Sequence, residues 1–246
     1  MNRGTLDIHH VNKAIAENYR KLRTRIGIVA LAFPIIVVAV GFYWGIGLKP
    51  TLSDYYYAKD PVGSRIDMYP VRLWFCGLLF IVGAFLYKYE GFSPNENRWL
   101  SLAGFFALGV AVFPTSLDGE YDFPFVHGIS AVLAFVCIAV VILWYSDLTL
   151  QELEKADAAA YKRYKIYYRC IGIFMVAAIG VSVFLHYAVK KEDSFILLAE
   201  ACGIWAFAAY WFVKNKEMHL VSMFLEKQGM VRPSIAATQN EVAKAL

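Results

Sequence analysis

The sequence predicts an all-α polytopic membrane protein, a bundle of six transmembrane helices with both termini in the cytoplasm. Apolar residues make up 59% of the 246 residues and charged residues only 18%, whereas soluble domains contain about 45–50% and about 25%. The mean hydropathy is +0.48. The apolar residues form solid blocks of helical span length, which excludes a soluble globule, a disordered chain and an outer-membrane barrel. Six spans leave no room for a separate soluble catalytic domain.

Six apolar runs define the predicted spans. They cover residues 26–43, 71–87, 99–113, 126–144, 167–189 and 195–213. The third run is short for a span, but Pro114 ends it and apolar residues flank it, so a slightly longer helix fits. Small residues recur on one face of this run at Ala103, Ala107 and Ala111, which predicts close packing on a neighbouring helix.

Three regions follow along the chain: residues 1–25, the bundle 26–213, and residues 214–246. Apolar residues recur in the first 25 residues at three- and four-residue spacing among basic ones, which predicts an amphipathic helix on the cytoplasmic leaflet. A solvated helical arm is the alternative. Residues 214–246 read as a short helix followed by a polar tail. In the loop after the fourth run, Thr149 precedes Glu152 by three residues, a capping-box signal for a short helix.

Basic residues are distributed unequally between the two sides of the predicted bundle. Of the 24 lysines and arginines, 18 lie on the side that holds both termini and six on the other. The positive-inside rule therefore assigns both termini to the cytoplasm. The outer loops hold eight acidic residues, so the outer face is acidic. Compact loops and the lack of a signal-peptide pattern favour a bacterial inner (plasma) membrane.

Four polar residues lie at the outer ends of predicted spans. Glu200 is the only carboxylate inside an apolar run, and a buried carboxylate is unfavourable unless it is neutralised or paired. Arg72 begins the second span, His127 begins the fourth, and His186 lies one turn from the end of the fifth. We expect these four side chains to share one pocket that opens away from the cytosol. A structural polar pair, a snorkelling arginine and hydrogen-bonded interface histidines are the alternatives.

Two outer loops add further polar candidates. Ser53 and Asp54 precede a run of three tyrosines, and Asp118 lies in the loop before His127. The complete candidate ligand-binding set is Ser53, Asp54, Arg72, Asp118, His127, His186 and Glu200. The sequence assigns no catalytic residue, cofactor or metal ligand. The four cysteines all fall within predicted spans, and no two of them form a CxxC pair. We therefore interpret them as packing residues: Cys76, Cys137, Cys170 and Cys202.

A scattered pattern over residues 52–144 resembles the Frag/DRAM-type six-helix membrane proteins, which include GPI-anchor lipid-remodelling proteins. The pattern comprises Leu52-Ser53-Asp54, Arg72 followed by Gly77 and Gly83, Asn95, the run from Gly109 to Pro114, and His127-Gly128-Ile129-Ser130-Ala131. The resemblance implies a six-helix protein concerned with lipids. It brings no agreed set of catalytic residues.

Three functions remain open at this point. The first is a lipid-handling protein in which Arg72 meets a phosphate while Glu200 and His127 orient a polar group. The second is a zinc-dependent intramembrane hydrolase in the style of the ceramidase and adiponectin-receptor superfamily, although the chain has no HxxxH spacing. The third is a non-enzymatic sensor or scaffold with a protein partner at the cytoplasmic face. Ser53 and Ser130 lack a nucleophile elbow, which argues against a serine hydrolase. Membrane lipid is the expected partner, and nucleic acid is not.

Overall fold

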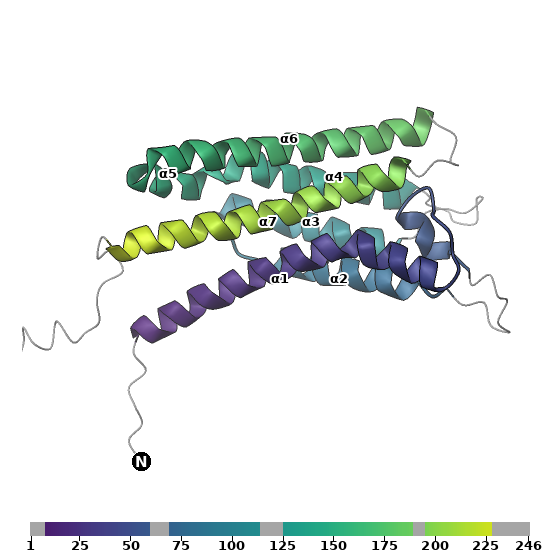
Figure 1. Ribbon diagram of the computed structural model, residues 1–246, viewed down its shortest axis with the longest axis horizontal. Helices are drawn as coiled ribbons and strands as arrows, with labels where there is room; N and C mark the ends of the chain where they lie inside the picture. The colour runs from purple at the N-terminus through teal and green to yellow at the C-terminus, as the bar shows by residue number, and fades with distance from the viewer. Residues whose placement is uncertain (1–7, 60–68, 114–124, 189–194, 228–246) are drawn as a thin grey trace, which may run out of the picture.

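The computed structural model describes residues 8–59, 69–113, 125–188 and 195–227, and these ranges are helical with short connections. The elements are α1 (Ile8–Tyr43), the 3₁₀ turn η1 (Ser53–Tyr57), α2 (Arg72–Lys88), α3 (Pro94–Val112), α4 (Phe125–Val140), the π-helical turn η2 (Val141–Tyr145), α5 (Asp147–Ala156), α6 (Ala158–Ala188) and α7 (Phe195–Lys227). The axes of the long helices lie roughly along one line of the molecule (Figure 1). The all-α prediction is confirmed.

Within the described ranges, four helical stretches are long and apolar enough to cross a membrane. They are Ala14–Tyr43, Phe125–Ala156, Ala158–His186 and Phe195–Leu225. The second of these continues from α4 through η2 into α5. Large apolar side chains also cover much of the exterior, as Leu73, Ile173 and Phe184 illustrate with exposed fractions of 78%, 63% and 67%. An exterior of this kind suits hydrocarbon and not water, and the chain is an integral membrane protein.

Helices α2 and α3 are not among the stretches that are both long enough and apolar enough to cross a membrane. The 17 residues of α2 extend over about 26 Å, slightly less than the roughly 30 Å of a bilayer core. The first turn of α3 is polar, with Asn95 and Glu96 among its residues. The two helices pack on each other, and α3 also packs on α4.

Several helices extend well beyond the predicted spans. Residues 8–25 continue α1 without a break, so they do not form a separate element in the described chain. The reason is that neither glycine nor proline occurs between Ile8 and Ile26. Likewise α6 begins at Ala158 and α7 continues to Lys227. The predicted polar tail from residue 228 lies outside the described residues.

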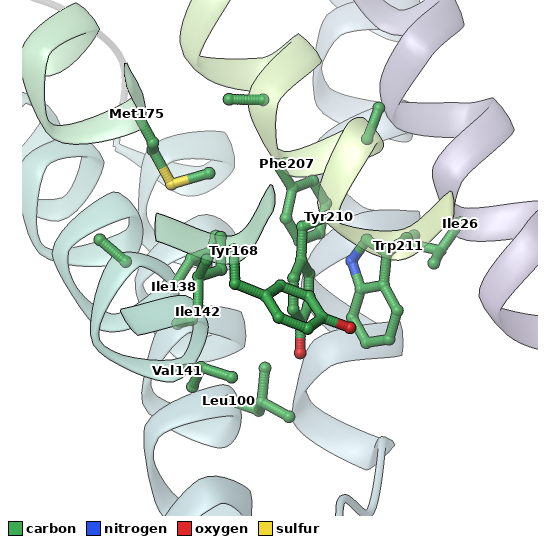
Figure 2. Close-up of a cluster of buried hydrophobic side chains, with 14 of the residues drawn as sticks. Ile26, Leu100, Ile138, Val141, Ile142, Tyr168, Met175, Phe207, Tyr210 and Trp211 are labelled. Atoms are coloured by element: carbon green, nitrogen blue, oxygen red, sulfur yellow. The ribbon is translucent and has the colours of Figure 1, made fainter. Parts of the chain in front are cut away.

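The bundle has two distinguishable ends. At one, here called the loop end, residues 44–58 lie beside the start of α7. At the other, the termini end, α1 begins and α7 ends (Figure 1). The core toward the termini end is aromatic: Tyr210 and Trp211 of α7 pack with Tyr168 of α6 (Figure 2), and the Tyr168 and Tyr210 ring centroids are 5.9 Å apart.

Candidate functional site at the loop end

The chain after α1 turns back over the bundle through glycine-dependent geometry. Gly45 has a φ of 71°, a left-handed conformation that favours glycine. The Tyr55 ring, fully buried, lies against Gly41, where an added Cβ would come within 2.5 Å of Cε1. Tyr55 thus anchors η1 on the end of α1 and fixes the position of Ser53.

Backbone hydrogen bonds attach this loop to α7. The Leu197 N–H donates to the Pro50 carbonyl at 2.8 Å. The Leu52 N–H donates to the Glu200 Oε2 at 2.7 Å. Within the loop, the Asp54 N–H donates to Thr51 Oγ1 at 3.0 Å, and the Thr51 N–H donates to Asp54 Oδ2 at 3.2 Å. This reciprocal pair has the pattern of a capping box and stabilises η1.

Ser53 and His127 form a hydrogen-bonded pair. Ser53 Oγ is 2.8 Å from His127 Nε2, and His127 Nδ1 is 2.7 Å from the Phe113 carbonyl oxygen. A carbonyl oxygen only accepts, so Nδ1 carries a proton and donates it. In the neutral imidazole Nε2 is then an acceptor, and the Ser53 hydroxyl donates to it. The His127 ring is buried, with 7% of the residue exposed.

A cavity of about 650 Å³ lies beneath this loop. Its polar lining residues gather at the loop end: Thr51, Ser53, Asp54, His127, Ser182, His186 and Glu200. Toward the termini end the lining is apolar and includes Leu86, Ile138 and Phe207. The lining residues of α4 extend from His127 to Ile138, which is about 16 Å along the helix. The cavity therefore has a polar end and a long apolar end.

The edge of the cavity on the side of α4 and α6 is largely apolar and also includes the exposed His186 of α6. Phe125, Ile129 and Val183 line the cavity and are also 59%, 52% and 38% exposed. A residue that both lines a cavity and reaches the surface marks an opening.

The candidate residues from the sequence divide into three groups. Five of them, Ser53, Asp54, His127, His186 and Glu200, line the cavity. Arg72 is not among the lining residues. Its guanidinium lies 4.3 Å from the Tyr56 ring centroid and 3.9 Å from that of Tyr69, and its Nε donates to the Tyr56 carbonyl at 3.0 Å. Asp118 lies outside the described residues.

Metal-binding and thiol chemistry have no assembled site in the described part of the chain. In those ranges no three histidine, cysteine, aspartate or glutamate side chains lie close enough to hold a metal ion. The four cysteines are free thiols. The predicted small-residue face of α3 is buried at Ala103, Ala107 and Ala111. Gly104, next to Ala103, lies close to α2, because an added Cβ there would come within 2.6 Å of the backbone at Gly83 and Tyr87.

A buried charged cluster at the termini end was not predicted from the sequence. Lys214 and Glu217 of α7 are 1% and 0% exposed, and Nζ lies 3.3 Å from Oε2. The same carboxylate accepts from the Tyr168 hydroxyl, and Lys214 donates to Thr149 of α5. The Thr149 hydroxyl also donates to the Ser146 carbonyl, so it does not act as the predicted helix cap. The available signal was the spacing of Lys214 and Glu217, which puts a charge pair on one helix face.

Two further charged residues surround this cluster. Arg23 of α1 is 6% exposed, and its Nη1 donates to the Tyr89 hydroxyl at 3.4 Å. Glu96 is 2% exposed and accepts from the Phe92 N–H at 2.8 Å. Ser93 caps α3 by accepting from the Glu96 N–H at 3.1 Å. The hydrogen bonds of Lys214 and Glu217 join α5, α6 and α7, and that of Arg23 joins α1 to Tyr89 at the end of α2.

Fold and cavity together define a helical integral membrane protein with a cavity that is polar at one end and opens between apolar residues. The chain belongs to the family described as "Protein of unknown function (DUF998)", which matches residues 22–214, about four-fifths of its length. No curated protein and no solved structure matches it. No finding connects the chain with the Frag/DRAM-type proteins, so that resemblance remains an expectation.

Proposed function

We propose that this protein handles lipids and that its cavity takes up a phospholipid-like molecule at the outer leaflet, to bind it, move it or remodel it. The observation that carries the proposal is the lengthwise division of the cavity into a polar and an apolar end. A lipid has the same division. The volume of about 650 Å³ falls within the range of ligand sites, and the apolar edge at Phe125 and Ile129 suits entry from the bilayer.

The charges in the cavity lining indicate which kind of lipid headgroup the cavity would hold. Among the described lining residues, the carboxylates of Asp54 and Glu200 are present and lysine and arginine are not. Arg72, stacked on tyrosine rings, is engaged elsewhere. The polar end therefore suits hydroxyl, ester or ammonium groups better than a bare phosphate. Ser182 Oγ, which is buried in the lining without a hydrogen-bond partner, offers one further contact.

The membrane arrangement is part of the same proposal. It comprises six crossing helices, with α2 and α3 as the two shorter ones, both termini in the cytoplasm, and the loop end in the outer leaflet of a bacterial inner membrane. The unequal division of lysines and arginines supports this orientation. The likeness to Frag/DRAM-type proteins agrees with a role in lipid handling. A protein partner at the cytoplasmic face is compatible with it.

Filling the cavity tests the proposal. Ala199 lines the cavity, whereas its neighbour Leu198 is 53% exposed and does not line it. The protein is purified in mild detergent and washed, and the lipid held per chain is counted by native mass spectrometry. We expect wild type and Leu198→Trp to retain lipid and Ala199→Trp to lose at least four-fifths of it. Equal retention by both variants, or no lipid on the wild type, would contradict the proposal.

A further inference from the structure

We infer that Ser53 and His127 form a nucleophile–base pair that cleaves a carboxylic ester of the lipid in the cavity. This rests on the proposed function, because the cavity must first hold the lipid. The inference stands on the geometry of two side chains 74 residues apart in sequence. No sequence motif brings them together.

The first support is the direction of the hydrogen bonds. The Phe113 carbonyl fixes the proton of His127 on Nδ1 and leaves Nε2 to accept from the Ser53 hydroxyl. A serine becomes nucleophilic when an adjacent base takes its proton, and that base requires a third group to hold its ring. The oxygen–nitrogen distance of 2.8 Å lies in the range required for proton transfer. Here a backbone carbonyl takes the orienting position that an aspartate holds in many serine hydrolases.

The second support is the location of the pair. Ser53 and His127 both line the polar end of the cavity, at the boundary where the apolar lining of α4 begins two residues later with Ile129. In a glycerolipid the ester groups lie at that same boundary, between the headgroup and the acyl chains. An acyl chain extending toward Ile138 and Phe207 would therefore present its ester carbonyl near Ser53.

The third support is that η1 holds Ser53 rigidly. Leu52 donates to Glu200, Asp54 pairs with Thr51, and Tyr55 is buried against Gly41. Three residues that flank Ser53 are thus fixed by contacts with α1, α7 and the loop itself. Catalysis requires a nucleophile held in place by its surroundings.

The reaction proceeds in two balanced steps. Ser53 Oγ attacks the ester carbonyl carbon while His127 Nε2 takes the hydroxyl proton. The bond to the alcohol oxygen breaks, and that oxygen leaves with the proton from Nε2, so an acyl-serine and a free alcohol remain. Water then attacks the acyl-serine and passes a proton to Nε2. Ser53 leaves with that proton, and the carboxylic acid is released.

Labelling by a long-chain fluorophosphonate tests this inference, because an activated serine displaces fluoride from the reagent and becomes phosphonylated. The protein in detergent micelles is treated with the hexadecyl reagent, and the modified residue is identified by peptide mass spectrometry. We expect labelling of Ser53 in the wild type, none in Ser53→Ala and at least a tenfold slower rate in His127→Asn. Ser130→Ala is the control, since Ser130 does not line the cavity, and it should react like the wild type.

A pH profile distinguishes two roles of the Ser53–His127 hydrogen bond. In one, His127 activates Ser53; in the other, the bond only holds the loop against α4. The labelling rate of the wild type should rise with pH through one ionisation that His127→Asn lacks. Lipid retention and thermal melting of each variant show whether it has folded. A folded, lipid-retaining wild type that is not labelled at Ser53, or His127→Asn labelled as fast as wild type, overturns the inference and leaves the proposed function standing. Loss of lipid from the wild type overturns the proposed function itself.

Discussion

The Glu200 carboxylate accepts a hydrogen bond from the Leu52 N–H at 2.7 Å and so connects α7 to the loop that carries Ser53. A carboxylate in an apolar helix requires a donor, and here the donor is backbone from a residue 148 positions away. The sequence identified the residue as unusual, because charge inside an apolar run is visible in composition. Its partner was not predictable, since any backbone N–H could have met it.

For Arg72 the sequence-based expectation and the structure differ, because this residue does not line the cavity. The sequence grouped it with the cavity residues because it begins a span at the same depth. In the structure its guanidinium stacks on Tyr56 and Tyr69 and donates to the Tyr56 carbonyl. Aromatic faces attract a guanidinium, and the tyrosines of η1 are adjacent to it. Depth in the membrane can be predicted from sequence, whereas the direction of a side chain around the bundle requires the helix contacts.

Glu96 gives a pH-dependent prediction. Burial at the start of α3 raises the pKa of its carboxyl, and the Phe92 N–H and Lys214 oppose the shift. A raised pKa in the folded state means that the folded protein holds the proton more tightly than the unfolded chain. Stability should therefore fall as the pH rises from the unfolded pKa of about 4.3 through the higher folded pKa. Thermal melting over a pH series in detergent measures this.

Glu96→Gln is the matched variant, because its amide oxygen can still accept from the Phe92 N–H while carrying no titrating group. Its melting temperature should vary less with pH over that window than the wild-type value does. An identical pH dependence in the two proteins would show that Glu96 does not titrate differently on folding.

At the scale of elements, the contact between α2 and α3 depends on glycine. A Cβ on Gly104 would come within 2.6 Å of both the Gly83 carbonyl oxygen and the Tyr87 nitrogen. These are backbone atoms, so the helices would have to separate. We expect Gly104→Ala to destabilise the protein by about 1–3 kcal/mol, the usual range for overpacking. Unfolding in a graded denaturing detergent measures the change.

Gly77 in α2 provides the control for this prediction. A Cβ there would meet nothing within 4 Å, and alanine is favoured over glycine inside a helix by about 0.5–1 kcal/mol. Gly77→Ala should therefore be neutral or stabilising. If the two variants behaved alike, the close approach of α2 and α3 would not be the cause.

The positions of the apolar helices could be predicted from sequence, and the helix ends could not. Apolar blocks mark the hydrocarbon core, and α4, α6 and α7 include the predicted runs almost entirely. However, α1 and α7 continue through polar residues, since a helix persists beyond the membrane unless glycine, proline or a cap ends it. The pairing of Ser53 with His127 and the burial of Lys214 with Glu217 depend on how separate elements pack. Neither is encoded in local spacing.

At the scale of the whole molecule, the two ends of the bundle have different chemistry. The loop end has a polar-lined cavity beneath a tethered loop, and the termini end holds the cluster of Arg23, Glu96, Lys214 and Glu217, whose charges are packed and buried. Trp211 belongs to the aromatic packing in Figure 2, and its ring also contacts that of Tyr89, whose hydroxyl accepts a hydrogen bond from Arg23 of the cluster. The termini end is packed and the loop end contains the cavity. This arrangement agrees with the proposal that a ligand enters from one side of the membrane.

Determining the structure of the wild-type protein in a phospholipid nanodisc tests the central claim most directly. If lipid handling is the function, elongated density should fill the cavity, with its polar end beside Ser53, His127 and Glu200 and its tail reaching Ile138 and Phe207. If the cavity instead contains only water or collapsed side chains while lipids are confined to the outer surface, the claim is contradicted.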